Sequence, residues 1–167
     1  MSKTITVFLF LIALFIIIGC NNNSHTALND FNLTLTQSQP LRINETLEDI
    51  ELTVINNVQW DSEFIELQLV NHTRHTIIYG EAFTIEFFDG GIWHIISSLK
   101  VYYLTFVDIG YILDSGDTDY FTRYLSLRFP DGLISGQYRL RMSISNDIDI
   151  PNREQHLHDL VTEFYIE

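Results

Sequence analysis

This 167-residue chain has little cysteine and little positive charge. It holds a single cysteine, which excludes an internal disulfide and any zinc site built from several thiolates. Its 9 lysines and arginines stand against 22 acids, for a formal net charge of −13. Because phosphate backbones are bound by clustered cations, this balance argues against nucleic acid as a partner. Hydrophobic residues still make up 46% of the chain, which is enough for the buried core of one domain.

Sequence patterns that carry catalysis are also missing. The chain has no Gly-x-Ser-x-Gly nucleophile motif and no glycine-rich phosphate loop with its lysine. Its serines and histidines show no spacing that would join them in one catalytic site. We therefore expect a protein that is not an enzyme and that needs no cofactor.

The longest hydrophobic run lies at the N-terminus. Lys3 precedes an uncharged stretch, residues 5–18, which is shorter than the roughly 20 residues that cross a bilayer and has the length of a signal-peptide core. The stretch ends at Ile17-Ile18-Gly19-Cys20, which resembles the lipobox of bacterial lipoproteins. The resemblance implies cleavage before Cys20 and diacylation of that residue. An uncleaved anchor and an ordinary cleaved signal peptide are the alternatives.

These expectations divide the chain into three parts. Residues 1–19 are predicted to be a lipoprotein signal peptide, residues 20–29 the lipidated cysteine with a flexible polar tether, and residues 30–167 one domain. Two or three acyl chains hold a protein firmly on a bilayer. We therefore expect a cell-membrane protein, attached to the lipid bilayer through Cys20 on the extracytoplasmic face.

Short runs with a two-residue hydrophobic period fill the rest of the chain, and long stretches with the helical period are absent. Turn residues separate the runs; Asp89-Gly90-Gly91, for example, predicts a tight hairpin. Residues 37–49 contain Pro40 and are predicted to form a loop or a broken edge strand. Many short strands at this spacing favour an all-β fold, a sandwich of about 7–9 strands. The predicted strands are 31–36, 50–55, 64–70, 82–88, 92–96, 119–128, 137–145 and 160–166.

Two aromatic residues have a predicted structural role. The spacing of Leu133, Gly136 and Tyr138 is that of a tyrosine corner, in which a tyrosine hydroxyl bonds to the backbone of the preceding connection. Gly136 lets the chain turn there without a side-chain clash. Trp93 is expected to pack in the core or against the hairpin. Tyr111, Tyr120 and Tyr124 are predicted to fill the sandwich and its edges, with a sugar-stacking or interface role as the alternative.

Several of these elements together resemble a bacterial immunoglobulin-like domain. The resemblance rests on Asn71-His72-Thr73, on Tyr79-Gly80 before an acidic strand, on Gly91-Ile92-Trp93 and on the tyrosine corner. It covers about residues 52–145 and departs at Met142, where the family often has lysine. It implies an immunoglobulin-like β-sandwich in a secreted or lipid-anchored protein of the Gram-positive type. It implies no reaction, because one fold serves many functions.

Metal ligation is the remaining chemistry that the sequence offers. His156 and His158 would share one face of a strand and could bind a transition metal if another histidine joined them. Asp114, Asp117 and Asp119 carry oxygen ligands that suit Ca²⁺, but without the spacing of an EF-hand. Both segments are more simply interpreted as polar loops, and we expect no metal site.

The function that these observations favour is a non-enzymatic binding or protein-interaction module of an anchored lipoprotein. Its partner is expected to be an envelope protein or a cell-wall ligand. Connections at the ends of the sandwich are the expected contact regions, namely 71–76, 97–104, 114–118 and 146–158. One alternative is a metal-binding or small metal-dependent protein that uses His156 and His158. Another is a structural accessory of an envelope complex.

Overall fold

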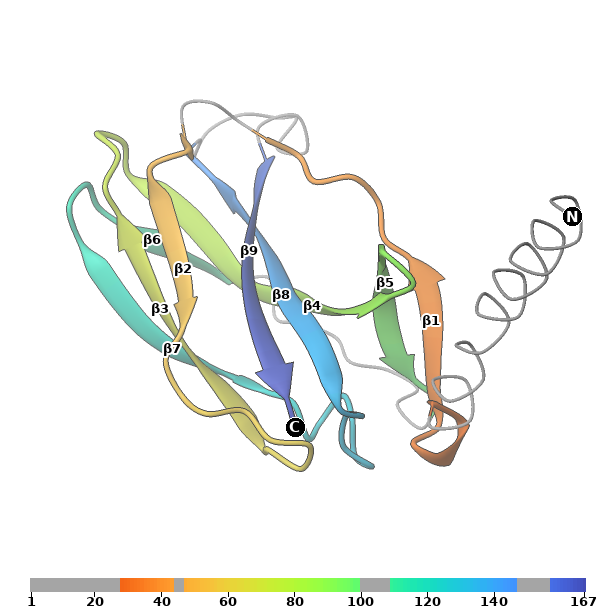
Figure 1. Cartoon of the computed structure of the whole chain (residues 1–167). Coiled ribbons are helices and arrows are strands. Elements are labelled where there is room, and N and C mark those ends of the chain that lie inside the picture. Colours follow the sequence, from red (N-terminus) through yellow and green to blue (C-terminus); the bar gives the residue numbers. More distant parts are fainter. Residues whose placement is uncertain (1–27, 44–46, 100–108, 147–156) are drawn as a thin grey trace, which may run out of the picture.

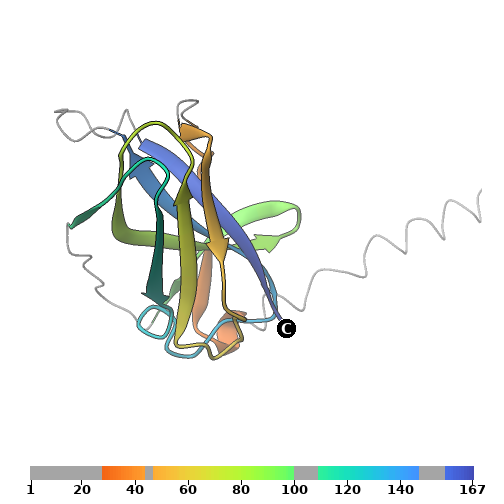
Figure 2. The same ribbon diagram turned by 90° about the vertical axis from the view of Figure 1, so that its left-hand side faces the viewer.

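The computed structural model describes residues 28–43, 47–99, 109–146 and 157–167. These residues form two antiparallel sheets packed face to face (Figure 1; Figure 2). None of the helices among them is long and apolar enough to span a bilayer. Nine strands make up the sheets: β1 (Leu33–Gln37), β2 (Ile50–Val54), β3 (Phe64–Asn71), β4 (Ile77–Asp89), β5 (Ile92–Ser98), β6 (Gly110–Leu113), β7 (Thr118–Tyr124), β8 (Gly136–Ser145) and β9 (Leu157–Ile166).

The larger sheet has the order β1-β5-β4-β8-β9, with β6 paired to β4, and the smaller sheet has the order β2-β3-β7. Alternate residues of each strand point between the sheets, so that Leu67 and Leu69 of β3 meet Ile85 of β4 and Leu140 of β8 in one fully buried core. This arrangement confirms the predicted all-β sandwich and its predicted number of strands. The turn Asp89-Gly90-Gly91 joins β4 to β5 as predicted, with both glycines at positive φ.

Strand β4 begins five residues earlier than the hydrophobic pattern predicts. Its pairing with β8 shifts between Tyr79 and Phe83, where β4 has extra residues relative to its partner. Glu81 occupies this irregularity and breaks the run of inward apolar residues, which is why the sequence pattern predicted a strand only from residue 82. Strand β6 was missing from the prediction because it is short and exposes both Tyr111 and Ile112.

Strand β7 ends at Tyr124, and the predicted extension to residue 128 is wrong. A helical turn follows instead, in which the amide of Phe129 donates to the carbonyl of Leu125 at 2.8 Å. The turn places Leu127 on the surface with 60% of its area exposed, although the alternating pattern had assigned it to a strand face.

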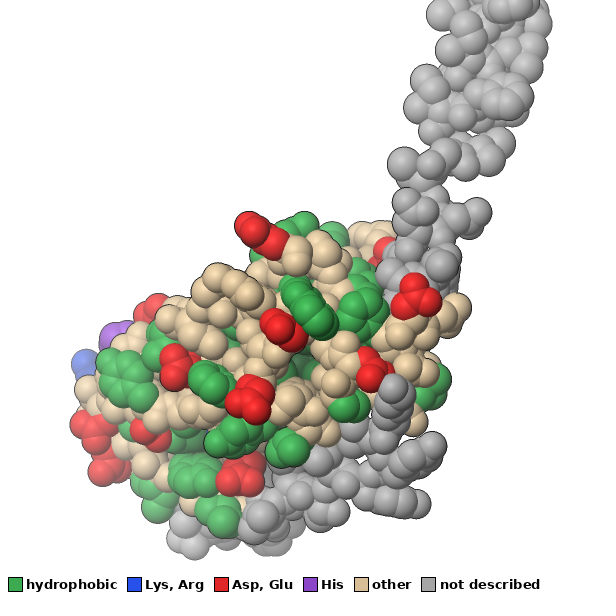
Figure 3. Space-filling view, turned by 90° about the horizontal axis from the view of Figure 1, so that it is seen from below, with side chains coloured by type: hydrophobic (Ala, Val, Ile, Leu, Met, Phe, Trp, Pro, Cys, Tyr) green, Lys and Arg blue, Asp and Glu red, His purple; other side chains and the backbone are tan. Residues whose placement is uncertain are grey.

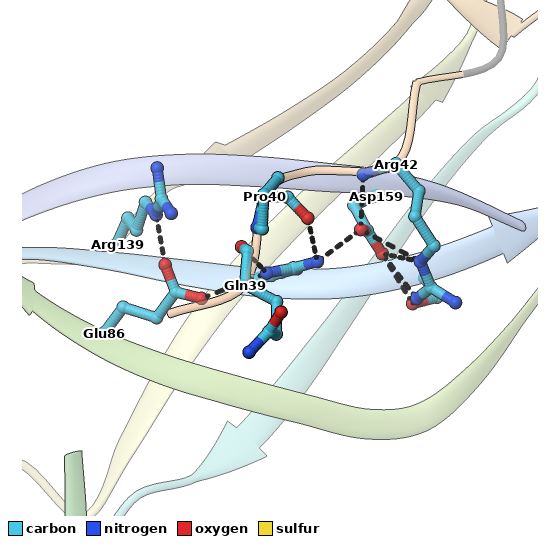
Figure 4. A network of polar contacts seen from close by, with 8 residues as sticks. Gln39, Pro40, Arg42, Glu86, Arg139 and Asp159 are labelled. Carbon is cyan, nitrogen blue, oxygen red and sulfur yellow. Dashed lines mark hydrogen bonds and ion pairs between the residues drawn. The ribbon is translucent and has the colours of Figure 1, made fainter. Parts of the chain in front are cut away.

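A buried ionic network fastens the segment after β1 to the outer face of the larger sheet (Figure 4). Glu86 of β4 pairs with Arg139 and Arg141 of β8, and Arg141 pairs in turn with Asp159 of β9 at 2.5 Å. Arg42 joins the same Asp159 carboxylate at 2.7 Å. Both carboxylate side chains are fully buried.

The segment that covers this network is the predicted loop 37–49, as far as its residues are described. Arg141 donates to the carbonyls of Gln39 at 2.9 Å and Pro40 at 3.2 Å, and the amide of Asp159 donates to the carbonyl of Arg42. Hydrogen bonds from the side chain and the backbone of Arg42, from Arg141 and from Ser143 outweigh the effect of burial and hold the pKa of Asp159 well below its usual range. The carboxylate is therefore ionised at neutral pH.

The tyrosine corner has the expected geometry. Tyr138 is fully buried, and its hydroxyl donates to the carbonyl of Ile134 at 2.6 Å. Its ring packs on Phe87 and Phe164. Gly136 lies at φ +150°, and a Cβ atom there would come within 2.5 Å of the Phe87 ring, so a side chain would disturb the packing around Tyr138.

Trp93 packs at the hairpin rather than in the core. It is half-buried in β5, opposite Phe88 of β4, and their ring centroids lie 5.0 Å apart. The Arg139 guanidinium lies 4.4 Å from its ring centroid, in a cation–π contact. Trp93 thus links the hairpin to the ionic network.

Candidate interaction surface

The residues predicted to carry lipid and metal fall partly outside the described chain. Cys20 and His156 lie outside the described residues. His158 is buried in β9 beside Ile144, and burial lowers its pKa, so the imidazole is neutral at pH 7. Among the residues that the structure describes, no group of three His, Cys, Asp or Glu side chains could hold a metal ion.

The three aspartates that were considered as calcium ligands lie in the β6–β7 turn and at the start of β7, and two of them have side-chain partners. Asp114 accepts a hydrogen bond from the Thr76 hydroxyl at 2.8 Å, and Asp119 accepts from the Tyr79 hydroxyl and from the Tyr120 amide. The hydrogen-bonded Asp119 carboxylate adds to burial in raising the pKa of Tyr79. Asp117 is exposed. These contacts stabilise the turn. Among the described residues, the three carboxylates do not form a group that could bind a metal ion.

Asn71 organises two of the connections that were expected to bind a partner. Its side chain is fully buried and donates to the carbonyls of His75, Leu113 and Asp114, while its Oδ1 atom accepts from the amide and hydroxyl of Thr73. The Asn71 side chain therefore links connection 71–76 to connection 114–118 through hydrogen bonds. Connections 97–104 and 146–158 lie largely outside the described residues.

The outer face of the smaller sheet exposes aromatic side chains that the sequence interpretation had assigned to the sandwich interior and its edges. Tyr120 and Tyr124 of β7 are 63% and 56% exposed. Tyr124 lies opposite Phe64 of β3, and Tyr120 lies opposite Gln68, whose amide donates to the Tyr120 hydroxyl at 2.9 Å. We call Phe64, Tyr120 and Tyr124 the aromatic face.

A hollow opens beside this face, where the β2–β3 and β7–β8 connections meet. The amides of Leu125 and Ser126 both donate to the carbonyl of Glu63, next to Phe64, so the hollow and the aromatic face are joined by backbone hydrogen bonds. Its volume is about 270 Å³. It is lined by Trp60, Asp61, Ser62, Ser126, Phe129, Pro130, Asp131 and Gly132, and we call it the Trp60 hollow.

Hydrophobic and acidic side chains alternate over this end of the molecule. Figure 3 views the protein from below, toward the β2–β3 and β7–β8 connections, and shows green and red side chains interspersed, with blue only at the margin. The exposed hydrophobic residues here include Trp60 and Leu127. The whole chain carries a formal net charge of −13.

Comparison with known proteins identifies the family. A model of the bacterial Ig-like domain family matches residues 30–156, which is most of the chain. The chain belongs to the bacterial Ig-like domain family. This membership confirms the immunoglobulin-like sandwich that the motifs from Asn71 to Tyr138 implied.

Other comparisons add little about function. No curated protein matches the chain. Among solved structures, the ASH/PapD-like domain of human CEP192 (PapD-like domain 7) is similar over 79% of this chain and 92% of that chain, with 12% identity and a TM-score of 0.36. We draw no argument from so distant a likeness.

Sequence reasoning missed the Trp60 hollow. Trp60 stands in a polar stretch, residues 56–63, that has no strand period, so no pattern drew attention to it. The only available signal was a tryptophan in a short segment without a strand period.

Proposed function

We propose that this protein is a membrane-anchored extracytoplasmic lipoprotein whose bacterial Ig-like domain is a non-enzymatic protein-interaction module. The observation that carries the proposal is the aromatic face, where Phe64, Tyr120 and Tyr124 stand exposed on adjacent antiparallel strands. Tyrosine and phenylalanine are enriched at protein interfaces because they bury large areas with few rotatable bonds. A flat sheet surface of this kind suits another protein better than it suits a small molecule, which needs a concave site.

The partner that fits best is an envelope protein with a basic surface patch. The acidic chain would attract such a patch over several ångströms and speed the encounter. The aromatic side chains would then supply short-range affinity. A cell-wall ligand is the competing partner.

The anchoring part of the proposal rests on the sequence from Ile17 to Cys20. Replacement of Cys20 by alanine should abolish the incorporation of labelled palmitate. It should also change the share of the protein that is recovered in the membrane fraction. Unchanged palmitate labelling in Cys20→Ala would contradict the proposed lipid anchor. It would not contradict the proposed interaction module.

Cross-linking in intact cells tests the interaction module. The full-length protein would be cross-linked, captured and analysed by mass spectrometry, beside a double variant, Tyr120→Ser with Tyr124→Ser. The matched control is Tyr165→Ser, because Tyr165 of β9 is 60% exposed but lies in the other sheet.

We expect one envelope protein to be recovered with the wild type and with the Tyr165→Ser control, and its recovery to fall about tenfold in the double variant, a loss of about 1.4 kcal/mol. Equal recovery in all three would show that the aromatic face is not the interface. Recovery of no specific protein would contradict the module itself and favour a cell-wall ligand.

A further inference from the structure

The backbone of Trp60 is anchored by hydrogen bonding, although its ring is exposed. Half of its surface, 52%, is open to solvent. Its backbone carbonyl accepts a hydrogen bond from the amide of Leu133 at 2.9 Å, which ties the β2–β3 connection to the β7–β8 connection. Gly132 lies at φ +87°, and a Cβ atom at this position would collide with the Trp60 carbonyl and approach its ring. Because the connection that carries Trp60 is already ordered, little backbone freedom is lost when a ligand packs against the ring.

The groups beside the ring are mainly negative. Asp61 and Asp131 line the hollow together with the hydroxyl-bearing Ser62 and Ser126, and among the described residues its lining contains no lysine, arginine or histidine. Asp131 is oriented by Asn32, whose side-chain amide donates to its Oδ2 atom at 3.0 Å. Asp61 is exposed. A cation entering here would meet the face of an indole and the exposed carboxylate of Asp61.

The hollow is large enough for the end of one long side chain. Its volume of about 270 Å³ lies just below the range of roughly 300–1,000 Å³ that is usual for small-molecule sites. A single long side chain, however, could place its charged end in it while the rest of the partner lies on the neighbouring aromatic face.

We propose that the Trp60 hollow binds an arginine or lysine side chain of a basic partner protein. This inference rests on the proposed function, because it names what the interaction module recognises. The indole of Trp60 attracts the cation through its negative ring face, and the exposed carboxylate of Asp61 accepts its N–H groups. A guanidinium is favoured over an ammonium, since it is flat, less strongly hydrated and able to stack on the ring.

Peptide binding to the full-length protein in detergent micelles tests this assignment. The probes are two blocked pentapeptides, acetyl-Gly-Arg-Gly-Arg-Gly-amide and its analogue with citrulline in place of both arginines. Citrulline keeps the shape of arginine and removes its charge. The readout is the NMR signal of the indole N–H groups, of which the chain has two, at Trp60 and Trp93.

We expect the arginine peptide to move the Trp60 signal and leave that of Trp93 in place, and to bind about fivefold more tightly than the citrulline peptide. Asp61→Asn should weaken binding by about threefold. Asp117→Asn removes the same charge from an exposed turn at the β6–β7 connection and should have no such effect. Trp60→Ala should abolish binding, and Trp60→Phe, which keeps an aromatic ring, should retain part of it.

Three results would overturn the inference. One is equal binding of the arginine and citrulline peptides. Another is a stronger response of the Trp60 signal to a tetramer of N-acetylglucosamine, which would make the hollow a sugar site. The third is full recovery of the cross-linked envelope protein by Trp60→Ala; this would leave the interaction module standing without the hollow. Conversely, selective binding of the arginine peptide without any captured protein would contradict the proposed function and not the site.

Discussion

Removal of one hydroxyl group, in Tyr138→Phe, should lower the free energy of unfolding by about 1–2 kcal/mol. The hydroxyl is fully buried and donates to the carbonyl of Ile134 at 2.6 Å. The phenylalanine ring would keep the contacts with Phe87 and Phe164, so only a one-atom gap forms. The lost hydrogen bond is worth about 0.5–1.5 kcal/mol, and the carbonyl left without this partner adds to the cost.

Urea unfolding followed by tryptophan fluorescence measures this change. With a slope of about 2 kcal/mol per molar urea, the midpoint should fall by roughly 0.5–1 M while the slope stays constant. Tyr165→Phe is the matched control, since Tyr165 is 60% exposed and its hydroxyl is replaced in water at little cost. An unchanged midpoint in Tyr138→Phe, or an equal fall in both variants, would refute the role of the tyrosine corner in stability.

Other predictions follow from the same contacts. Gly136→Ala should destabilise the fold by about 1–3 kcal/mol, because its Cβ atom would overlap Phe87; calorimetry should show a lower melting temperature, and an unchanged one would contradict the close approach. Asn71→Ala should cost about 3 kcal/mol or more by leaving buried carbonyls without donors, to be measured by urea unfolding against the exposed control His72→Ala. The pKa of Asp159 is lowered in the folded state, so its contribution to stability is complete above the unfolded value of about 3.9 and is lost as the pH falls below it. Urea midpoints measured from pH 7 to pH 3 should therefore fall less steeply in Asp159→Asn than in the wild type, and equal slopes would contradict this account.

Alternation of side chains predicted most of the strands because one face of each sheet is buried. The run from Tyr138 to Ile144 in β8 is the clearest case, since its inward residues are all apolar. The prediction failed where tertiary structure alters the local pattern. Glu81 interrupts β4 at its irregular pairing, and Leu127 continues an apparent alternation into a helical turn.

The candidate surface was harder to predict for a related reason. A tyrosine in a strand has the same pattern whether it points into the core or out from a sheet face, so the exposure of Tyr120 and Tyr124 depends on the register with β3. The Trp60 hollow is formed by two connections that are far apart in sequence. The burial of Arg141 likewise depends on a segment about 100 residues earlier in the chain, which crosses the sheet above it.

The buried position of Asn71 bears on how the protein can be produced. Asn71-His72-Thr73 matches the acceptor pattern for N-linked glycosylation, and a secretory eukaryotic host would treat it as a modification site during translocation. In the folded domain the asparagine amide is fully enclosed and contacts three carbonyl groups, so it has no room for a sugar. A glycan attached before folding would therefore keep the sandwich from closing. Production in a host that does not glycosylate avoids this artefact.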